Sequence, residues 1–281
     1  MRQRFVNTSK PMWNRVQETV SYLQNRTGFS PEYGVILGSG LGSFTDDITI
    51  EHRIPYAEIP NFPVSTVQGH AGALVFGTIG SKKVLAMQGR FHFYEGYGMQ
   101  QVTFPVRVMK YLGISKLIVS NASGGVKNTY QVGSIVLITD HINLMPEHPL
   151  HGPNEDRFGP RFLNMSAAYS KKMISLAEQI AQELSIEIQH GIYLALQGPT
   201  FETPAEYTMV KNLGADCVGM STVPEVIVAR HMDLEVFGLS VITDMATEAS
   251  IETVSHAEVL AAAQKAEPNV RKLIKGLIQA Y

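Results

Sequence analysis

Four short segments rich in glycine and small polar residues contain most of the side chains that could do chemistry. The first, residues 38–42 (GSGLG), follows the apolar run Val35-Ile36-Leu37. Glycines in such a turn let backbone amides point at an anion, and Ser39 adds a hydroxyl donor. Ser43 replaces the third glycine of a dinucleotide fingerprint, and the lysine of a nucleotide P-loop is missing. The segment predicts a site for one small anion, with a plain strand-to-helix turn as an equal alternative.

The second segment, residues 89–97 (GRFHFYEGY), follows an apolar run at 83–87. In an extended chain, alternation puts Arg90, His92 and Tyr94 on one side. Three polar donors on one side suit an oxyanion together with a sugar hydroxyl, and arginine supplies a planar fork that matches phosphate. A half-buried strand with a solvated polar face is the alternative.

The third and fourth segments repeat the pattern of small residues after a strand. Residues 121–125 (NASGG) follow the run 116–120, and their amides could approach a ligand closely, although a tight turn explains them equally well. Residues 219–225 (GMSTVPE) run from a strand end into a helix, with a possible Thr222–Glu225 capping box. The amides there and the Ser221 hydroxyl could receive an anion at the helix start.

The elements that must position these segments alternate along the chain. We expect strands at residues 34–37, 73–76, 83–87, 116–120, 134–139, 191–196, 217–220 and 234–242. We expect helices at residues 11–26, 102–112, 165–184, 203–213, 223–231 and 255–280. This order predicts an α/β fold: one domain over residues 1–281, with a mixed, twisted and largely parallel central sheet flanked by helices. Ligands of such sheets bind where strands end and helices begin.

Two helix starts carry clear capping signals. Thr203 and Glu206 form one predicted capping box, and Ser255 and Glu258 form another. Both capping boxes place the neighbouring residues, including His256, at the N-terminus of a helix.

Composition limits the class of protein. The chain has 281 residues, of which 44% are hydrophobic and 17% charged, and its formal net charge is −2. No dense run of Lys or Arg indicates a nucleic-acid partner, and no segment is apolar for long enough to suggest a membrane partner. Cys217 is the single cysteine. The sequence predicts no disulfide, no metal site and a cytoplasmic location.

Nine segments in register resemble the trimeric, mammalian-like purine nucleoside phosphorylases, over residues 34–262. They are residues 35–42, 59–63, 69–72, 89–97, 103–107, 140–144, 157–162, 198–203 and 219–230. The resemblance implies a phosphorylase/hydrolase-like fold, inorganic phosphate as a substrate, no cofactor and a homotrimer. It implies phosphorolysis of inosine- and guanosine-type nucleosides to free purine and ribose 1-phosphate in purine salvage, with adenosine or xanthosine as further candidates.

The resemblance also implies a role for each matching residue. The phosphate ligands are Ser39, Arg90, His92, Ala122 and Ser221, with His70 in a flanking loop. The ribose contacts are Tyr94, Met220, His256 and Phe158, the last lent by a neighbouring subunit. The base contacts are Phe201, Glu202, Val218 and Asp244, and the residues implied in catalysis are His92, Glu202 and Asp244.

Asp244 departs from the family pattern. Members that act on inosine and guanosine usually carry asparagine there, which can both accept from N-7 and donate to O-6, whereas an ionised aspartate only accepts. Relatives that cleave methylthioadenosine also carry aspartate but lack counterparts of Glu202 and His256. The preferred purine therefore stays open, and Asp244 could also turn away from the base.

Two other classes of function remain as alternatives. A nucleosidase that uses water would leave Arg90 and residues 38–42 idle, and a nucleoside sensor would show no turnover. A dehydrogenase is disfavoured by Ser43.

Overall fold

The computed structural model describes residues 10–66, 71–245 and 255–281. Its strands are β1 (Tyr33–Ile36), β2 (Thr49–Pro55), β3 (Ala73–Ile79), β4 (Lys82–Gln88), β5 (Lys116–Gly125), β6 (Ile135–Asn143), β7 (Ile188–Ala195), β8 (Cys217–Gly219) and β9 (Glu235–Met245). Its α-helices are α1 (Met12–Thr27), α2 (Met99–Val102), α3 (Phe104–Leu112), α4 (Lys171–Glu183), α5 (Pro204–Asn212), α6 (Val223–His231) and α7 (His256–Ala280). Short 3₁₀ helices are η1 (Gly42–Asp47), η2 (Tyr56–Glu58) and η3 (Phe93–Glu95).

The strands form one mixed sheet in the order β2-β3-β4-β1-β5-β8-β7-β6-β9, and β9 also pairs with β5. That extra pairing closes five strands into a ring, from which β1, β4, β3 and β2 extend as an open arm. Five of the nine pairings are parallel and four are antiparallel. The predicted α/β fold with a mixed sheet is confirmed.

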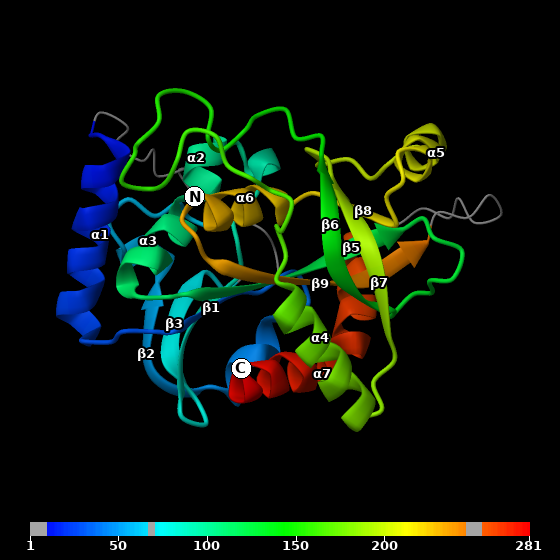
Figure 1. Ribbon diagram of the computed structural model, residues 1–281, viewed down its shortest axis with the longest axis horizontal. Coiled ribbons are helices and arrows are strands. Elements are labelled where there is room, and N and C mark those ends of the chain that lie inside the picture. Colours follow the sequence, from blue (N-terminus) through cyan, green and yellow to red (C-terminus); the bar gives the residue numbers. More distant parts are fainter. Residues whose placement is uncertain (1–9, 67–70, 246–254) are drawn as a thin grey trace.

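Helices cover the sheet in two groups (Figure 1). One apolar cluster joins α1, α3 and α6 to the sheet through residues such as Val20, Val108 and Val226. A second joins α4 and α7 through Ala177 and Leu273. Because both faces are covered, most residues of β1, β5 and β9 are buried, which explains why their apolar runs lack alternation. Among the described residues, no helix combines the length and apolar character needed to cross a bilayer.

Several boundaries differ from those expected from the sequence. Strand β5 continues through the third segment to Gly125, where β9 and β8 supply partners, so this segment is not a tight turn. The helix expected from residue 165 begins at Lys171, because the Ser170 hydroxyl caps it by accepting from the Met173 amide. The capping boxes at Thr203 and Ser255 are confirmed.

Candidate active site

A cavity of about 430 Å³ opens where β1, β4, β5, β8 and β9 end. All four glycine-rich segments reach it, together with the loop before α5 and the start of α7. Its lining includes twelve of the thirteen residues proposed from the sequence: Ser39, Arg90, His92, Tyr94, Ala122, Phe201, Glu202, Val218, Met220, Ser221, Asp244 and His256. The cavity has the size of a typical small-molecule site.

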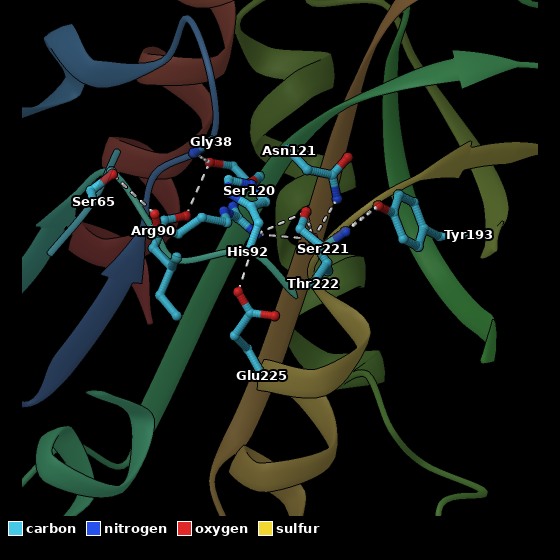
Figure 2. Close-up of polar contacts among 12 residues, drawn as sticks. Gly38, Ser65, Arg90, His92, Ser120, Asn121, Tyr193, Ser221, Thr222 and Glu225 are labelled. Carbon is cyan, nitrogen blue, oxygen red and sulfur yellow. Dashed lines mark hydrogen bonds and ion pairs between the residues drawn. The ribbon is translucent and has the colours of Figure 1, made fainter. Parts of the chain in front are cut away.

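Arg90 lies in the loop after β4 and is held from several sides (Figure 2). Its Nη1 donates to the Thr222 hydroxyl at 3.1 Å and to the Ser221 hydroxyl at 3.2 Å. It also pairs with the Glu225 carboxylate at 3.5 Å, while Nη2 donates to the Ser120 carbonyl. These contacts fix a fully buried guanidinium at the cavity wall, where an anion would meet a prearranged donor.

Thr222 links Arg90 to Asn121 and has a backbone conformation that is rare for threonine. Its φ is 72° and ψ is −55°, and its side chain is completely buried. Its hydroxyl accepts from Asn121 Nδ2 at 2.8 Å as well as from Arg90. The predicted Thr222–Glu225 capping box is therefore wrong, because both side chains turn to Arg90 instead of to the helix amides.

His92 is oriented by Glu95 and Tyr94. Its Nδ1 lies 3.1 Å from Glu95 Oε1, and its ring stacks on Tyr94 with centroids 4.7 Å apart. Burial lowers the pKa of His92, although the hydrogen bond with Glu95 acts to raise it. Burial acts to raise the pKa of Glu95, but hydrogen bonds from His92 and Thr66 outweigh it and lower that pKa. A neutral histidine beside an ionised glutamate follows.

The other wall carries two acids, Glu202 before α5 and Asp244 at the end of β9. Burial, with the nearby charge of Asp244, raises the pKa of Glu202 to about 7. Burial also raises the pKa of Asp244, although hydrogen bonds from Tyr207 and Thr243 act to lower it. The cavity thus has an anion-binding side rich in donors and a second side with two carboxyl groups whose pKa values are both raised.

Phe158 is the proposed residue that the cavity does not include. Its ring is 4% exposed and packs against Trp13 and Tyr111, with the Arg107 guanidinium 4.6 Å from its centroid. In this conformation it presents almost no surface to another subunit. A ribose contact across an interface stays a prediction, and His70 lies outside the described residues.

The sequence did not reveal the residues that position the side chains lining the cavity. Glu225, Thr222, Asn121, Glu95 and Tyr207 all position a lining side chain through the contacts above or through Asp244. One signal was present for Glu225, since a carboxylate within the largely apolar helix 223–231 requires a buried partner. Within the described ranges, no group of three His, Cys, Asp or Glu side chains is arranged to hold a metal ion.

Comparison with known proteins agrees with this geometry. The family model described as the phosphorylase superfamily matches residues 32–279. Purine nucleoside phosphorylase 1 of Bacillus subtilis is 50% identical over 270 residues, covering 96% of this chain and 100% of the relative. The chain belongs to the purine nucleoside phosphorylases. Their rat member is 50% identical over 272 residues, covering 93% of this chain and 94% of that one.

Solved purine nucleoside phosphorylases share the fold. The Schistosoma mansoni enzyme in complex with adenosine superposes with a TM-score of 0.90 at 42% identity, covering 95% of this chain and 97% of that one. A Schistosoma mansoni purine nucleoside phosphorylase in complex with inosine gives a TM-score of 0.90 at 40% identity, covering 95% of this chain and 96% of that one. The predicted activity, phosphorolysis of purine nucleosides of the inosine and guanosine type in purine salvage, is confirmed, with phosphate as a substrate.

Proposed function

We propose that the two sides of the cavity divide the reaction between them, with phosphate bound by Ser39, Arg90, His92, the Ala122 amide and Ser221. The observation that carries this assignment is the buried Arg90 guanidinium, which is fixed at the cavity wall by its hydrogen bonds to the Ser221 and Thr222 hydroxyls and by its ion pair with Glu225. Phosphate held there is both nucleophile and electrostatic partner for the oxocarbenium-like sugar. The protein contributes position and charge, and no covalent intermediate is required.

Ribose lies between the two sides, against Tyr94 and Met220, with His256 directed at the 5′-hydroxyl. Support comes from the cavity lining, to which these three side chains contribute together with the phosphate donors and the two acids. The purine lies beside Phe201 and Val218, where Glu202 and Asp244 grip its edge. A proton that reaches N-7 makes the base a better leaving group.

Asp244 bears on the choice of purine. Its carboxylate can accept from a 6-amino group, so we expect appreciable adenosine cleavage beside that of inosine and guanosine. The solved relative in complex with adenosine supports the fit of a 6-aminopurine to this fold.

The native assembly is a homotrimer in the cytoplasm. Phe162 is 90% exposed in the loop that also contains Phe158, and an apolar side chain so exposed suits a subunit interface. The single cysteine, Cys217, is buried and free, as suits a reducing compartment.

A turnover panel with inosine, guanosine, adenosine and xanthosine, each with and without phosphate, tests the assignment. Release of base should require phosphate and yield ribose 1-phosphate. Equal rates without phosphate would instead indicate a nucleosidase, and absence of turnover on all four would indicate a binding protein.

A further inference from the structure

The hydroxyl of Tyr207 hydrogen-bonds with both acids of the cavity. It donates to Oδ2 of Asp244 at 3.0 Å, and it also interacts with the carboxyl group of Glu202. Tyr207 is on α5, Asp244 ends β9, and Glu202 precedes α5. The other oxygen of Asp244, Oδ1, accepts from the Thr243 hydroxyl at 3.1 Å.

A phenol has one proton to donate and lone pairs to accept, so it cannot donate to two carboxylates at once. One extra proton resolves this conflict in two ways. In one, Glu202 is protonated and donates to Tyr207, which donates to ionised Asp244. In the other, Asp244 is protonated and donates to Tyr207, which donates to ionised Glu202. The states interconvert when Glu202 gives its proton to the phenol oxygen while the phenol proton passes to Asp244, and Tyr207 stays neutral.

The surroundings favour such a shared proton. Burial raises the pKa of each carboxyl group, and the charge of Asp244 raises the pKa of Glu202 further. Glu206 on α5 acts on Glu202 in the same direction, and burial raises the pKa of Tyr207 so that it remains a phenol. His256 at the start of α7 and Tyr94 of η3 also line the cavity and can titrate. Two carboxyl groups held together in this way titrate as a unit.

Gly124 of β5 leaves the space for this contact. A Cβ at this position would lie 2.8 Å from Asp244 Oδ2 and 3.3 Å from the Tyr207 hydroxyl. Any larger residue would push the carboxylate and the phenol apart, so the glycine of the third segment has a role beyond chain flexibility.

The two proton arrangements match the two classes of purine edge. A 6-aminopurine offers an acceptor at N-1 and a donor at the amino group, and so needs protonated Glu202 and ionised Asp244. A 6-oxopurine offers a donor at N-1 and an acceptor at O-6, and so needs the reverse. We propose that Tyr207 shares one proton between Glu202 and Asp244 and thereby lets one cavity accept both 6-amino- and 6-oxopurine nucleosides. The inference rests on the proposed placement of the base against these two acids.

The wild-type enzyme provides the first test, through kcat/KM for inosine and adenosine between about pH 6 and pH 8. Because both substrates use the same singly protonated pair, their ratio should change by less than about twofold across this range. Titration of phosphate affects both substrates equally and cancels. If inosine instead used a pair with both acids ionised, adenosine would need one proton more than inosine, and the inosine-to-adenosine ratio would rise about tenfold per pH unit above the pKa of Glu202. That result would overturn the proposal.

Tyr207→Phe removes the hydroxyl and keeps the ring. We expect the inosine-to-adenosine ratio to shift by about fivefold or more, because the hydroxyl that joins the two carboxyl groups and sets the balance between their two proton arrangements is lost. Thr243→Val removes a hydroxyl that contacts Asp244 and the Ser123 carbonyl, and its ratio should change less than that of Tyr207→Phe. Thr208→Val, on an exposed residue of the same helix, is the control for damage to α5 and should match wild type. Should Tyr207→Phe fail to fold, the wild-type ratio decides the matter.

Asp244→Asn separates this inference from the proposed function. The amide can donate to O-6 without a shared proton, so the variant should favour inosine, and adding Tyr207→Phe should then change the ratio little. An unchanged ratio in Asp244→Asn would remove Asp244 from the base site. A changed ratio there, with Tyr207→Phe behaving as wild type, would overturn proton sharing alone.

Discussion

The guanidinium of Arg90 and the carboxylate of Glu225 lie 3.5 Å apart, with 2% and 3% of their side-chain surfaces exposed. One Glu225 oxygen, Oε2, is buried without a hydrogen-bond partner among the described residues. Two charges at this depth are costly to desolvate, so each depends on the other. A phosphate that binds Arg90 therefore enters a site whose positive charge already has a buried counter-ion.

Glu225→Gln should lower the free energy of unfolding by about 3–5 kcal/mol, because it leaves Arg90 as an unpaired buried charge. Phosphate should then raise Tm more in the variant than in wild type, since the anion becomes the main counter-charge. Thermal unfolding with and without saturating phosphate measures this. A smaller phosphate effect in the variant would show that Glu225 chiefly positions the guanidinium.

Arg90→Ala should weaken phosphate binding more than any other single change in the lining. Loss of a charge-assisted contact costs about 1.5–3 kcal/mol, or roughly tenfold or more in the KM for phosphate. Arg53→Ala is the matched control, because Arg53 is an exposed arginine on β2. A variant at Arg90 with the wild-type KM for phosphate would contradict the assignment.

His256→Ala should reduce kcat/KM for nucleosides with a free 5′-hydroxyl and spare their 5′-deoxy analogues. The residue is exposed at the first position of α7, where Ser255 and Glu258 already supply the cap. Steady-state kinetics on an inosine pair that differs at C-5′ gives the comparison. Equal losses on both substrates would mean that His256 serves the helix start and not the sugar.

Phe158→Ala tests the ring that packs against Trp13 and Tyr111. A fully packed phenylalanine costs about 3–5 kcal/mol to truncate, so we expect a lower Tm as well as slower turnover. Sedimentation analysis of both proteins reports on assembly. A variant with unchanged Tm and impaired turnover would support donation of this ring to a neighbouring site, and a fully active native monomer would exclude it.

Glu202→Gln should flatten the dependence of stability on pH. Since burial raises the pKa of Glu202 from 4.5 to about 7, the folded state holds a proton that the unfolded state releases. The stabilisation from this proton is complete below pH 4.5 and is lost as the pH rises to about 7. Denaturant titrations across that window should show a steeper decline for wild type than for the variant, whereas parallel curves would contradict the raised pKa.

Most elements of the fold were predictable because their apolar runs are buried on both faces. Helix α6 has the bounds expected from its sequence, Val223–His231. Strand β2 was missed because its sequence, TIEHRIP, is mostly exposed and contains no apolar run. It forms as an outer strand through backbone pairing with β3, an interaction that the side-chain pattern does not record.

The residues that line the cavity were predictable because family motifs contain them. The residues that hold those side chains in position were not predictable. Tyr207 and Asp244 are 37 positions apart, and only the approach of α5 to the end of β9 brings them together. Likewise, the unusual backbone conformation of Thr222 could not be predicted, because its local sequence fits an ordinary helix cap. Such long-range contacts depend on tertiary packing and produce no periodic pattern in the sequence.

The closed ring of strands has a consequence for how copies of the chain can associate. Because β9 pairs with both β5 and β6, β2 is the one strand of the described sheet with a neighbour on a single side. That free edge carries Glu51, His52 and Arg53, and it ends at Pro55, which has no backbone N–H to offer. Edge-to-edge aggregation through β2 is therefore opposed, which favours association of copies through side-chain surfaces instead.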